Sequence, residues 1–456
     1  MQISRAAIVM VIATTTVTGT AAAADNTKRF GEEILDILKE DGTIDQARYQ
    51  ELRAKEAEEA RAATSPDRDD WKISYRDALT LERRDGSAKI SIGGRLQADF
   101  ATIHVTDALE AAVSGGDGEG VELRRARFYM QGELNERIFW KSQIEFAKGA
   151  VVLADAYIGM KGLGALGSVK VGHMKEPFSL EELTSSKYIT FMERSLPAVF
   201  DSARDFGLNF SNTLFDQRMT WAAAIMAPTG PSGFSFSSSA DFNAGARVTG
   251  LPIYRDAGRR LLHLGFSGIY KSRDGTMFRF RRRPEIHLAK RYYDTGDLSS
   301  DGAGVIAVEL AGVYGSFHFA SEWKQTWIDE TTLGRQVGFG GYVSAGYFLT
   351  GEHRPYETSN ATWNRVEPIE PFDPGKGQWG AFEIATRYSH LDLDRDELKG
   401  GSGQDISWAL NWYLYSSLRI STNYVYADLK STGVGEDRTR TKGTVHAFQT
   451  RVQIEF

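Results

Sequence analysis

The chain is 456 residues long, carries a net charge of −6 and contains no cysteine. Disulfide frameworks and thiolate chemistry are therefore excluded, and the negative balance argues against a nucleic-acid partner. The hydrophobic content of 41% and the mean hydropathy of −0.35 resemble those of a water-soluble protein. They also fit a membrane barrel, because half of each barrel strand faces water. The length allows two or three ordinary domains or one large barrel.

Residues 1–24 predict a secretory signal peptide. Arg5 precedes an apolar stretch from Ala6 to Val17, and small residues ending at Ala24 form an A-x-A cleavage site. A basic start, a short apolar region and such a site are typical of secretory signals. An anchoring helix is the alternative, but the apolar run is shorter than the roughly 20 residues that a spanning helix needs. We therefore expect the mature chain to leave the cytoplasm.

Residues 25–70 predict a periplasmic helical extension and a linker. Apolar residues recur at helical spacing from Phe30 to Leu38, Asp41-Gly42 interrupts the pattern, and a second, highly charged helix is expected through Ala63. The second helix offers too little apolar surface for a domain core. Three roles remain open: a solvated extension, a small bundle that joins protomers, and a tether to the peptidoglycan.

Residues 71–456 predict an all-β fold, a closed antiparallel transmembrane β-barrel of about sixteen strands. Successive side chains of a strand point to opposite faces, so a barrel strand alternates between apolar residues toward lipid and polar residues toward a wet lumen. The last thirteen residues show this clearly, and the pattern recurs from residue 90 to 146 and from 408 to 426. In the last strand, Phe448, Thr450, Val452, Ile454 and Phe456 alternate with Gln449, Arg451, Gln453 and Glu455.

The joints between these strands alternate between tight and long. An outer-membrane barrel has short periplasmic turns and long external loops, and an even strand number leaves both ends in the periplasm. The sequence therefore predicts a protein of the outer membrane of a Gram-negative bacterium, surrounded by outer-membrane lipid and lipopolysaccharide. The short joints are 135–136, 212–215, 314–316 and 416–417, and the long ones are 107–120, 176–204, 228–239, 273–301 and 430–443.

The sequence does not predict an enzyme. Residues 162–167 match the G-x-G-x-x-G dinucleotide fingerprint, but a strand rather than a helix is expected to follow, which indicates a hairpin turn. No nucleophile elbow and no H-E-x-x-H motif are present, and the eight histidines show no ligand spacing. A hydrolase embedded in the barrel would need a Ser–His pair, and no spacing suggests one. We expect no catalytic residue, no metal site and no cofactor.

Two long loops carry the functional expectations. The loop 176–204 is too apolar to extend into solvent, so it is expected to fold into the lumen, narrow the pore and make permeation selective. The loop 273–301 holds six basic residues between Arg279 and Arg291, beside aromatic residues. It either binds lipopolysaccharide at the surface or forms a cationic lining that attracts anions. Guanidinium groups bind phosphate through paired hydrogen bonds and would favour oxyanions over chloride.

Three stretches resemble the phosphate-selective porin O and P family. They are ISIGGRLQADF (90–100), LRRARF (123–128) and, above all, SLEELTSSKYITFMERSLP (179–197). The likeness covers roughly residues 88–456. It implies a sixteen-stranded outer-membrane barrel, usually a homotrimer, that conducts small anions by passive diffusion. It also implies that basic residues line the channel and that the third loop meets the solute at the constriction.

By position, the resemblance assigns Arg124 and Arg125 to the family's paired arginines, Ser185 and Ser186 to its T-S-S-K serines, and Arg281 and Arg283 to the R-x-R-P element of the fifth loop. One departure stands out: Glu182, preceded by Glu181, occupies the position of a lysine in the phosphate-selective members. Two carboxylates at a constriction repel a phosphate dianion unless a cation, such as Arg194 or Lys187, pairs with them.

The sequence thus predicts a porin for passive diffusion of small anions, with phosphate or other oxyanions among the candidates. The alternative is a general or organic-solute porin without phosphate selectivity. For the constriction loop we select Glu181, Glu182, Thr184 and Glu193. For the pore lining and anion binding we select Arg95, Arg124, Arg125, Arg127, Ser185, Ser186, Lys187, Arg194, Arg279, Arg281 and Arg283.

Overall fold

The computed structural model describes residues 39, 45–63, 71–76, 78–147, 149, 151–202, 204–230, 233, 241–273, 277–395, 398–432 and 441–456. The chain divides into two units, Met1–Asp70 and Trp71–Phe456. The first unit contains helix α2 (Gln46–Ala63), which lies within the second expected helix. The expected signal peptide, first helix and linker lie outside the described residues. None of the helices described is both long and apolar enough to cross a bilayer.

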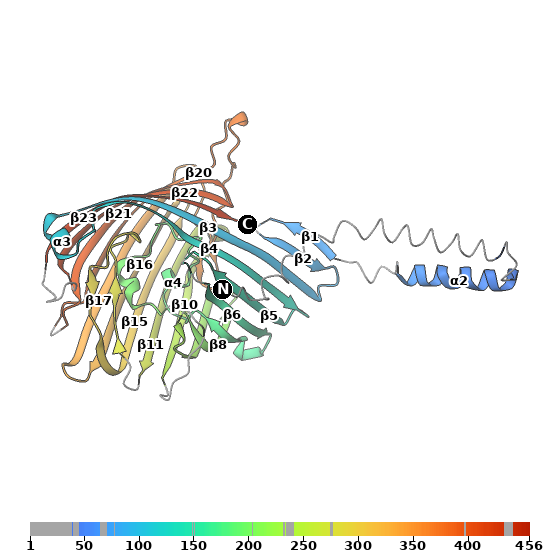
Figure 1. The fold of residues 1–456 in the computed structure, drawn as a ribbon, viewed down its shortest axis with the longest axis horizontal. Coiled ribbons are helices and arrows are strands. Elements are labelled where there is room, and N and C mark those ends of the chain that lie inside the picture. The colour runs from blue at the N-terminus through green and yellow to red at the C-terminus, as the bar shows by residue number, and fades with distance from the viewer. Residues whose placement is uncertain are drawn as a thin grey trace, which may run out of the picture. The chain divides into compact units, whose positions relative to one another are not determined.

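The second unit is a closed antiparallel β-barrel (Figure 1). In the described part of the chain it has sixteen wall strands, which pair in chain order, and the last strand pairs with the first, with Arg451 opposite Asp99. This confirms the predicted fold class and strand number. The wall strands are β3 (Ala88–Val105), β4 (Gly118–Leu134), β5 (Ile138–Glu145), β6 (Val152–Lys161), β7 (Ser168–Met174), β8 (Asp205–Leu214), β9 (Met219–Ala227), β10 (Phe242–Arg255), β11 (Arg260–Ser272), β15 (Leu298–Tyr314), β16 (Phe317–Glu330), β17 (Gly334–Phe348), β20 (Ala381–Asp392), β21 (Gly401–Tyr415), β22 (Leu418–Thr432) and β23 (Gly443–Glu455).

A hairpin of β1 (Trp71–Tyr75) and β2 (Leu79–Arg83) extends the wall at the seam, the place where the last strand β23 pairs with the first strand β3. Strand β2 pairs with the first residues of β3, and β23 pairs with β3 from Arg95 onward. The two partners meet at Gly94, whose carbonyl accepts a hydrogen bond from the Phe456 N–H at 3.2 Å. A Cβ at Gly94 would lie 2.6 Å from the Phe456 ring. The absence of a side chain at Gly94 therefore lets the C-terminal residue dock against β3.

The barrel exposes apolar side chains outward and buries polar ones inside, as the alternation in the sequence predicts. In β23, Phe448 is 55% exposed, whereas Arg451 is fully buried. A protein that turns its apolar face outward needs lipid rather than water around it. The same arrangement holds in the other wall strands, where outward residues such as Phe100, Phe266, Trp323 and Trp408 are each at least 41% exposed.

The connections follow the predicted order of short turns and long loops with two exceptions. The first is the turn between β16 and β17 (residues 331–333), which has three residues although it lies at the end of the barrel that carries the long loops. The glycine-rich stretch 162–167 forms the turn between β6 and β7 and includes the short 3-10 helix η3 (Gly164–Leu166). Gly162, Gly164 and Gly167 all have positive φ angles of 61–80°, so a hairpin turn explains them without a nucleotide site. Another turn holds η6 (Asp256–Gly258), and the first long loop holds α3 (Asp107–Ala112).

The second exception is the segment 349–380 between β17 and β20, a long connection at the end of the barrel where short turns were expected. It contains the two-residue strands β18 (Tyr356–Glu357) and β19 (Thr362–Trp363) and the 3-10 helix η7 (Pro374–Lys376). Four of the chain's eleven prolines lie in this segment. Proline cannot donate to a strand ladder, so this clustering is a signal from which the long connection was predictable.

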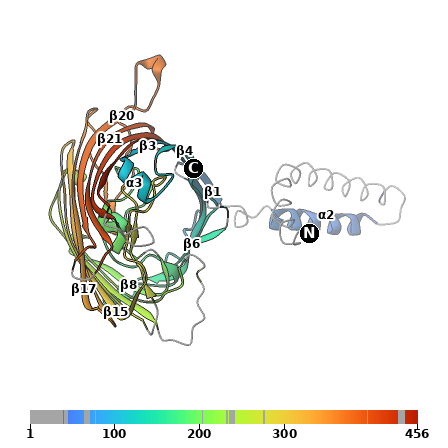
Figure 2. The ribbon, with the colours of Figure 1, turned by 60° about the vertical axis from the view of Figure 1, so that its left-hand side comes forward.

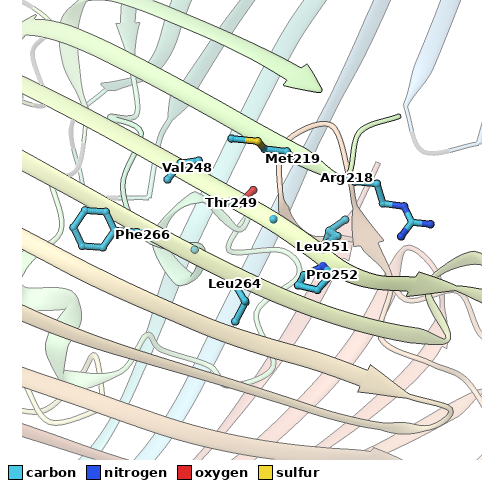
Figure 3. A pocket seen from close by; sticks show the side chains of 10 residues that line it. Arg218, Met219, Val248, Thr249, Leu251, Pro252, Leu264 and Phe266 are labelled. Atoms are coloured by element: carbon cyan, nitrogen blue, oxygen red, sulfur yellow. The ribbon is translucent and has the colours of Figure 1, made fainter. Parts of the chain in front are cut away.

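A shallow apolar depression of about 530 Å³ lies on the lipid-facing side of β9, β10 and β11 (Figure 3). The exposed side chains of Val248, Leu264 and Phe266 surround it, and the lack of a side chain at Gly250 deepens it. This depression is on the outside of the wall, so it is separate from the polar lumen.

Candidate functional site in the barrel lumen

The loop between β7 and β8 (residues 175–204, called L3 below) lies inside the barrel. It contains α4 (Leu180–Leu183) and η4 (Leu196–Phe200). Its Glu181 N–H donates to Glu322 of β16 at 2.7 Å, and its Met192 N–H donates to Asn423 of β22 at 2.8 Å. On the far side, the amide of Gln97 in β3 donates to the L3 backbone. In Figure 2 the short green helices of this loop lie inside the curve of the strands.

Buried ion pairs attach L3 to the wall. Arg451 of β23 binds Asp99 of β3 through two hydrogen bonds of 2.7 and 2.6 Å and also reaches Glu193 of L3 at 2.9 Å. Lys324 of β16 pairs with Asp201 of L3. Charges that are removed from water in this way are stable only when they are paired. These pairs therefore fix the position of the loop.

Glu182, which departs from the phosphate-selective pattern, and the preceding Glu181 are both paired. Glu182 accepts ion pairs from Lys175 and Arg194, each at 3.1 Å. Burial alone would raise the pKa of Glu182, but the charges of Arg194 and Lys175 outweigh it and lower the pKa to about 2. Glu181 pairs with Arg387 at 3.1 Å and accepts from the Ser195 hydroxyl at 2.6 Å. Of the two cations considered as partners for these carboxylates, Arg194 does pair with Glu182, whereas Lys187 pairs with Glu455 instead.

We expect Lys175 to make anion selectivity depend on pH. Burial lowers the pKa of Lys175 to about 7, although Glu182 opposes the shift and Arg194 and Arg204 add to it. Below pH 7 this lysine is protonated and adds a positive charge, whereas above pH 7 it is neutral. Glu182 stays ionised throughout, because its pKa is about 2. Reversal potentials in a salt gradient should therefore report stronger anion preference at pH 6 than at pH 8. In Lys175→Met this step should vanish, and an undiminished step would contradict the assignment.

The remaining selected residues of L3 lie between the loop and the wall. The guanidinium of Arg95 donates to the Ser185 hydroxyl at 3.2 Å, and the Thr184 hydroxyl donates to the Leu180 carbonyl at 2.8 Å. Ser186 is buried, and its hydroxyl has no partner among the described residues. Lys187 pairs with Glu455, the penultimate residue of the chain, at 2.9 Å.

A β-bulge turns both paired arginines into the lumen. Gln97 of β3 lies opposite Arg125, and the next residue of β3 lies opposite Leu123, so Arg124 is the extra residue of the bulge. Strict alternation would place Arg124 on the lipid side, but its guanidinium binds Glu193 at 2.8 and 2.9 Å. Arg125 is buried and donates to Gln97, and Arg127 pairs with Glu145 at 2.7 Å.

Three selected arginines of the basic loop (residues 273–297, called L5 below) are bonded within the loop. It contains β12 (Met277–Phe278), β13 (Arg281–Arg282) and β14 (Tyr293–Asp294). Arg279 and Arg281 share the carboxylate of Asp294, at 2.7 and 3.1 Å. Arg283 donates to a backbone carbonyl within the loop at 2.7 Å. The residue that bonds to L3 is Arg282, which donates to the Ser195 carbonyl at 2.7 Å and was not selected from the sequence.

The segment 349–380 reaches L3 from the opposite end of the barrel. The backbone N–H of Trp363 donates to the Thr184 hydroxyl at 3.3 Å, and the buried Arg354 donates to the Tyr188 carbonyl. Arg365 pairs with Glu455 at 2.6 Å, the same carboxylate that Lys187 binds. L3 is therefore bonded both to L5 and to this segment inside the barrel.

L3 makes few bonds to the wall strands β5–β7, and inward side chains such as Lys141 and Tyr157 stay half-buried there, so these strands are called the uncovered wall below. Among the described residues of L3, Arg204 alone bonds to these strands, through Asp155 at 2.8 Å. Lys141 of β5 lies 3.8 Å from the same carboxylate and keeps 27% of its side chain exposed. Lys170 of β7 is also half-buried. Lys141, Lys170 and Arg204 were not selected, although the alternation in β5 placed Lys141 on the polar face.

Comparisons with known proteins give the family. The model of the family described as "Phosphate-selective porin O and P" matches residues 90–456. The chain belongs to this family. An uncharacterized protein of Caulobacter vibrioides is 30% identical over 387 residues, covering 81% of this chain and 73% of that protein. Porin O of Pseudomonas aeruginosa is 25% identical over 428 residues, covering 84% and 92%.

Two solved structures share the barrel fold. OmpT of Vibrio cholerae in its trimer form has a TM-score of 0.51 at 11% identity and covers 81% of this chain and 100% of its own. An anion-selective porin from Comamonas acidovorans has a TM-score of 0.50 at 12% identity, with the same coverage. This member of the porin O and P family is an outer-membrane barrel of a Gram-negative bacterium. Members of such a family are channels rather than enzymes, in agreement with the sequence.

Proposed function

We propose that this porin passes small anions by diffusion through the part of the lumen bordered by strands β4–β7 and L3. The observation that carries the proposal is an excess of positive charge there. Among the described residues, seven cations gather around three carboxylates, Glu145, Asp155 and Glu455. The cations are Arg95, Arg127, Lys141, Lys170, Lys187, Arg204 and Arg365.

These groups form one connected cluster. Lys141 and Arg204 share Asp155, and Lys187 and Arg365 share Glu455. The charges of Arg127, Arg204 and Glu455 all act on Arg95, which therefore belongs to the same cluster. Fixed charges of one sign between low-dielectric walls raise the local concentration of counter-ions, so the cluster favours anions over cations.

The proposal is tested with the mature protein in planar bilayers that separate two concentrations of potassium chloride. A reversal potential near the chloride equilibrium potential supports an anion pore. A value near the potassium equilibrium potential overturns it, and a value near zero assigns a non-selective diffusion pore instead.

The same measurement compares the contributions of L5 and of the uncovered wall to anion selectivity. We expect Arg281→Ala/Arg283→Ala to retain most of the anion preference, because Arg281 is already paired with Asp294 and Arg283 is bonded within L5. Lys141→Gln/Lys170→Gln removes the same number of positive charges from the uncovered wall. It should shift the reversal potential more strongly, and the opposite order would return the selectivity role to L5.

We also propose a homotrimer in the membrane. The trimer form of the structurally similar OmpT supports it, since the two barrels share their architecture. Measurement of the mass of the detergent-solubilised protein, corrected for bound detergent, tests the proposal, and a monomer would contradict it.

A further inference from the structure

The uncovered wall and the neighbouring strand β4 interleave two lysine ammonium groups with aromatic rings. Five inward side chains of β4–β7, called the Lys–Tyr wall below, form this pattern: Tyr129, Phe139, Lys141, Tyr157 and Lys170. Lys141 and Tyr157 are direct cross-strand partners. Phe139 and Lys170 lie on either side of Gly159, the residue opposite both. A Cβ at Gly159 would lie 2.4 Å from the Phe139 ring, so glycine makes room for that ring.

Each ammonium group of this wall lies near a ring. The Nζ of Lys141 is 5.6 Å from the centroid of Tyr129, and that of Lys170 is 5.6 Å from the centroid of Tyr157. The rings of Phe139 and Tyr157 meet edge to face, with centroids 6.4 Å apart. All five side chains are half-buried, so water inside the barrel reaches them. Opposite them, Lys187 of L3 lies 5.9 Å from the Tyr129 ring and continues the pattern.

The guanidinium groups of the lumen are less available to a solute than these ammonium groups, because they are paired with carboxylates or buried. Among the described residues, Arg127 pairs with Glu145, Arg204 with Asp155, and Arg124 with Glu193. Arg95 and Arg125 bond to neutral partners but are only 4% and 5% exposed. Paired hydrogen bonds from guanidinium forks are what inorganic phosphate gains most from. That binding mode is largely occupied here by the protein's own carboxylates.

The groups left for a solute are ammonium charges beside aromatic faces and edges. Lys170 forms no ion pair with a carboxylate among the described residues, and Lys141 has only the long contact to Asp155. A compact ammonium attracts any anion, whereas the rings add contact energy only to a solute that has an apolar part. An inorganic oxyanion gains the first effect alone. A solute with a carboxylate on an apolar body gains both.

We propose that the Lys–Tyr wall is a binding site for organic carboxylates with an aromatic or other compact apolar body, and that the porin prefers these to inorganic phosphate. The carboxylate binds Lys141 and Lys170, and the apolar body lies against Tyr157 and Phe139. This deepens the proposed function and rests on it, since it names the anions that the pore favours.

The test uses single channels of the mature protein in potassium chloride, with sodium benzoate, acetate or inorganic phosphate added to one side. The concentration that halves the chloride current measures occupancy of the site. Benzoate and acetate carry the same charge, so a difference between them isolates the ring. We expect benzoate to act at about one tenth of the acetate concentration, the size of effect that an aromatic contact provides. The concentration that halves the chloride current should also be higher for phosphate than for benzoate.

Two variants locate the effect. Tyr157→Leu should raise the halving concentration of benzoate about fivefold without changing that of acetate, and Tyr157→Phe, which keeps the ring, should behave like the unchanged protein. Tyr270→Leu is the matched control, because Tyr270 is 49% exposed on the outer face. Equal halving concentrations for benzoate and acetate, or a lower one for phosphate, overturn the inference while anion selectivity stands. A cation-selective reversal potential would instead overturn the proposed function itself.

Discussion

Arg451→Met is expected to lower the free energy of unfolding of the barrel by about 3–5 kcal/mol, the usual cost of leaving a buried charge without its partner. Arg451 is fully buried and holds Asp99 through two hydrogen bonds, and its third contact reaches Glu193 of L3. Losing it leaves the Asp99 carboxylate unpaired at the seam where β23 closes on β3. Denaturant unfolding in detergent micelles, followed by tryptophan fluorescence, measures the change.

Two further variants separate the lost pair from a general effect of losing an arginine. Arg335→Met removes an exposed arginine that pairs with Asp329 at 2.8 Å, and should change the unfolding free energy by less than about 1 kcal/mol. Asp99→Asn added to Arg451→Met removes the stranded charge and should restore part of the loss. The single variant should also give noisier channel currents, because L3 loses an anchor. Unchanged stability in Arg451→Met would show that the ion pair does not hold the seam.

Lys141→Glu/Lys170→Glu is expected to reduce the ratio of anion to cation permeability about tenfold or more, enough to remove or invert an anion preference. Each exchange replaces a positive charge of the uncovered wall with a negative one, at short range from a permeating ion and between low-dielectric walls. The two carboxylates would join Asp155, which already lies 3.8 Å from Lys141. Reversal potentials in a potassium chloride gradient report the ratio directly.

Lys376→Glu is the matched control, since the Lys376 side chain is 72% exposed and pairs with Asp373 on the segment 349–380. It changes the charge by two units, half of the change in the double variant, away from the Lys–Tyr wall, and should leave the reversal potential near that of the unchanged protein. If it shifts the reversal potential by half as much as the double variant does, the total charge of the chain sets selectivity and the wall has no special role. The effect should also weaken at high salt, because mobile ions screen fixed charges.

Much of the barrel was predictable because its physics is local. A side chain's face follows from its position in the strand, so the alternation from Phe448 to Phe456 was sufficient to orient β23 and place Arg451 in the lumen. The glycines of 162–167 identified a turn for the same reason, since positive φ angles are a property of single residues. The family likeness rested on such local stretches and extends over the wall.

The site was less predictable, because it depends on partners distant in sequence. Arg281 was selected for the pore lining and anion binding, and the structure shows that it shares the Asp294 carboxylate with Arg279. Glu182 was a reason to doubt phosphate selectivity, because its carboxylate would repel phosphate. In the structure this carboxylate forms ion pairs with Lys175 and Arg194. Arg124 faces the lumen only because a bulge interrupts the alternation. None of these pairings follows from residue type or spacing.

The sequence by itself determined the class of molecule: a strand-rich wall with an apolar outside, a polar inside and one long loop too apolar for solvent. The tertiary structure decided which charges remain available to a solute. With L3, L5 and the segment 349–380 in place, most of the guanidinium groups in the lumen form ion pairs or buried contacts. Lys141 and Lys170 lie beside aromatic rings instead. The physical reason is that alternation acts between neighbouring residues, whereas electrostatic pairing acts through space between whichever groups the closed barrel brings together.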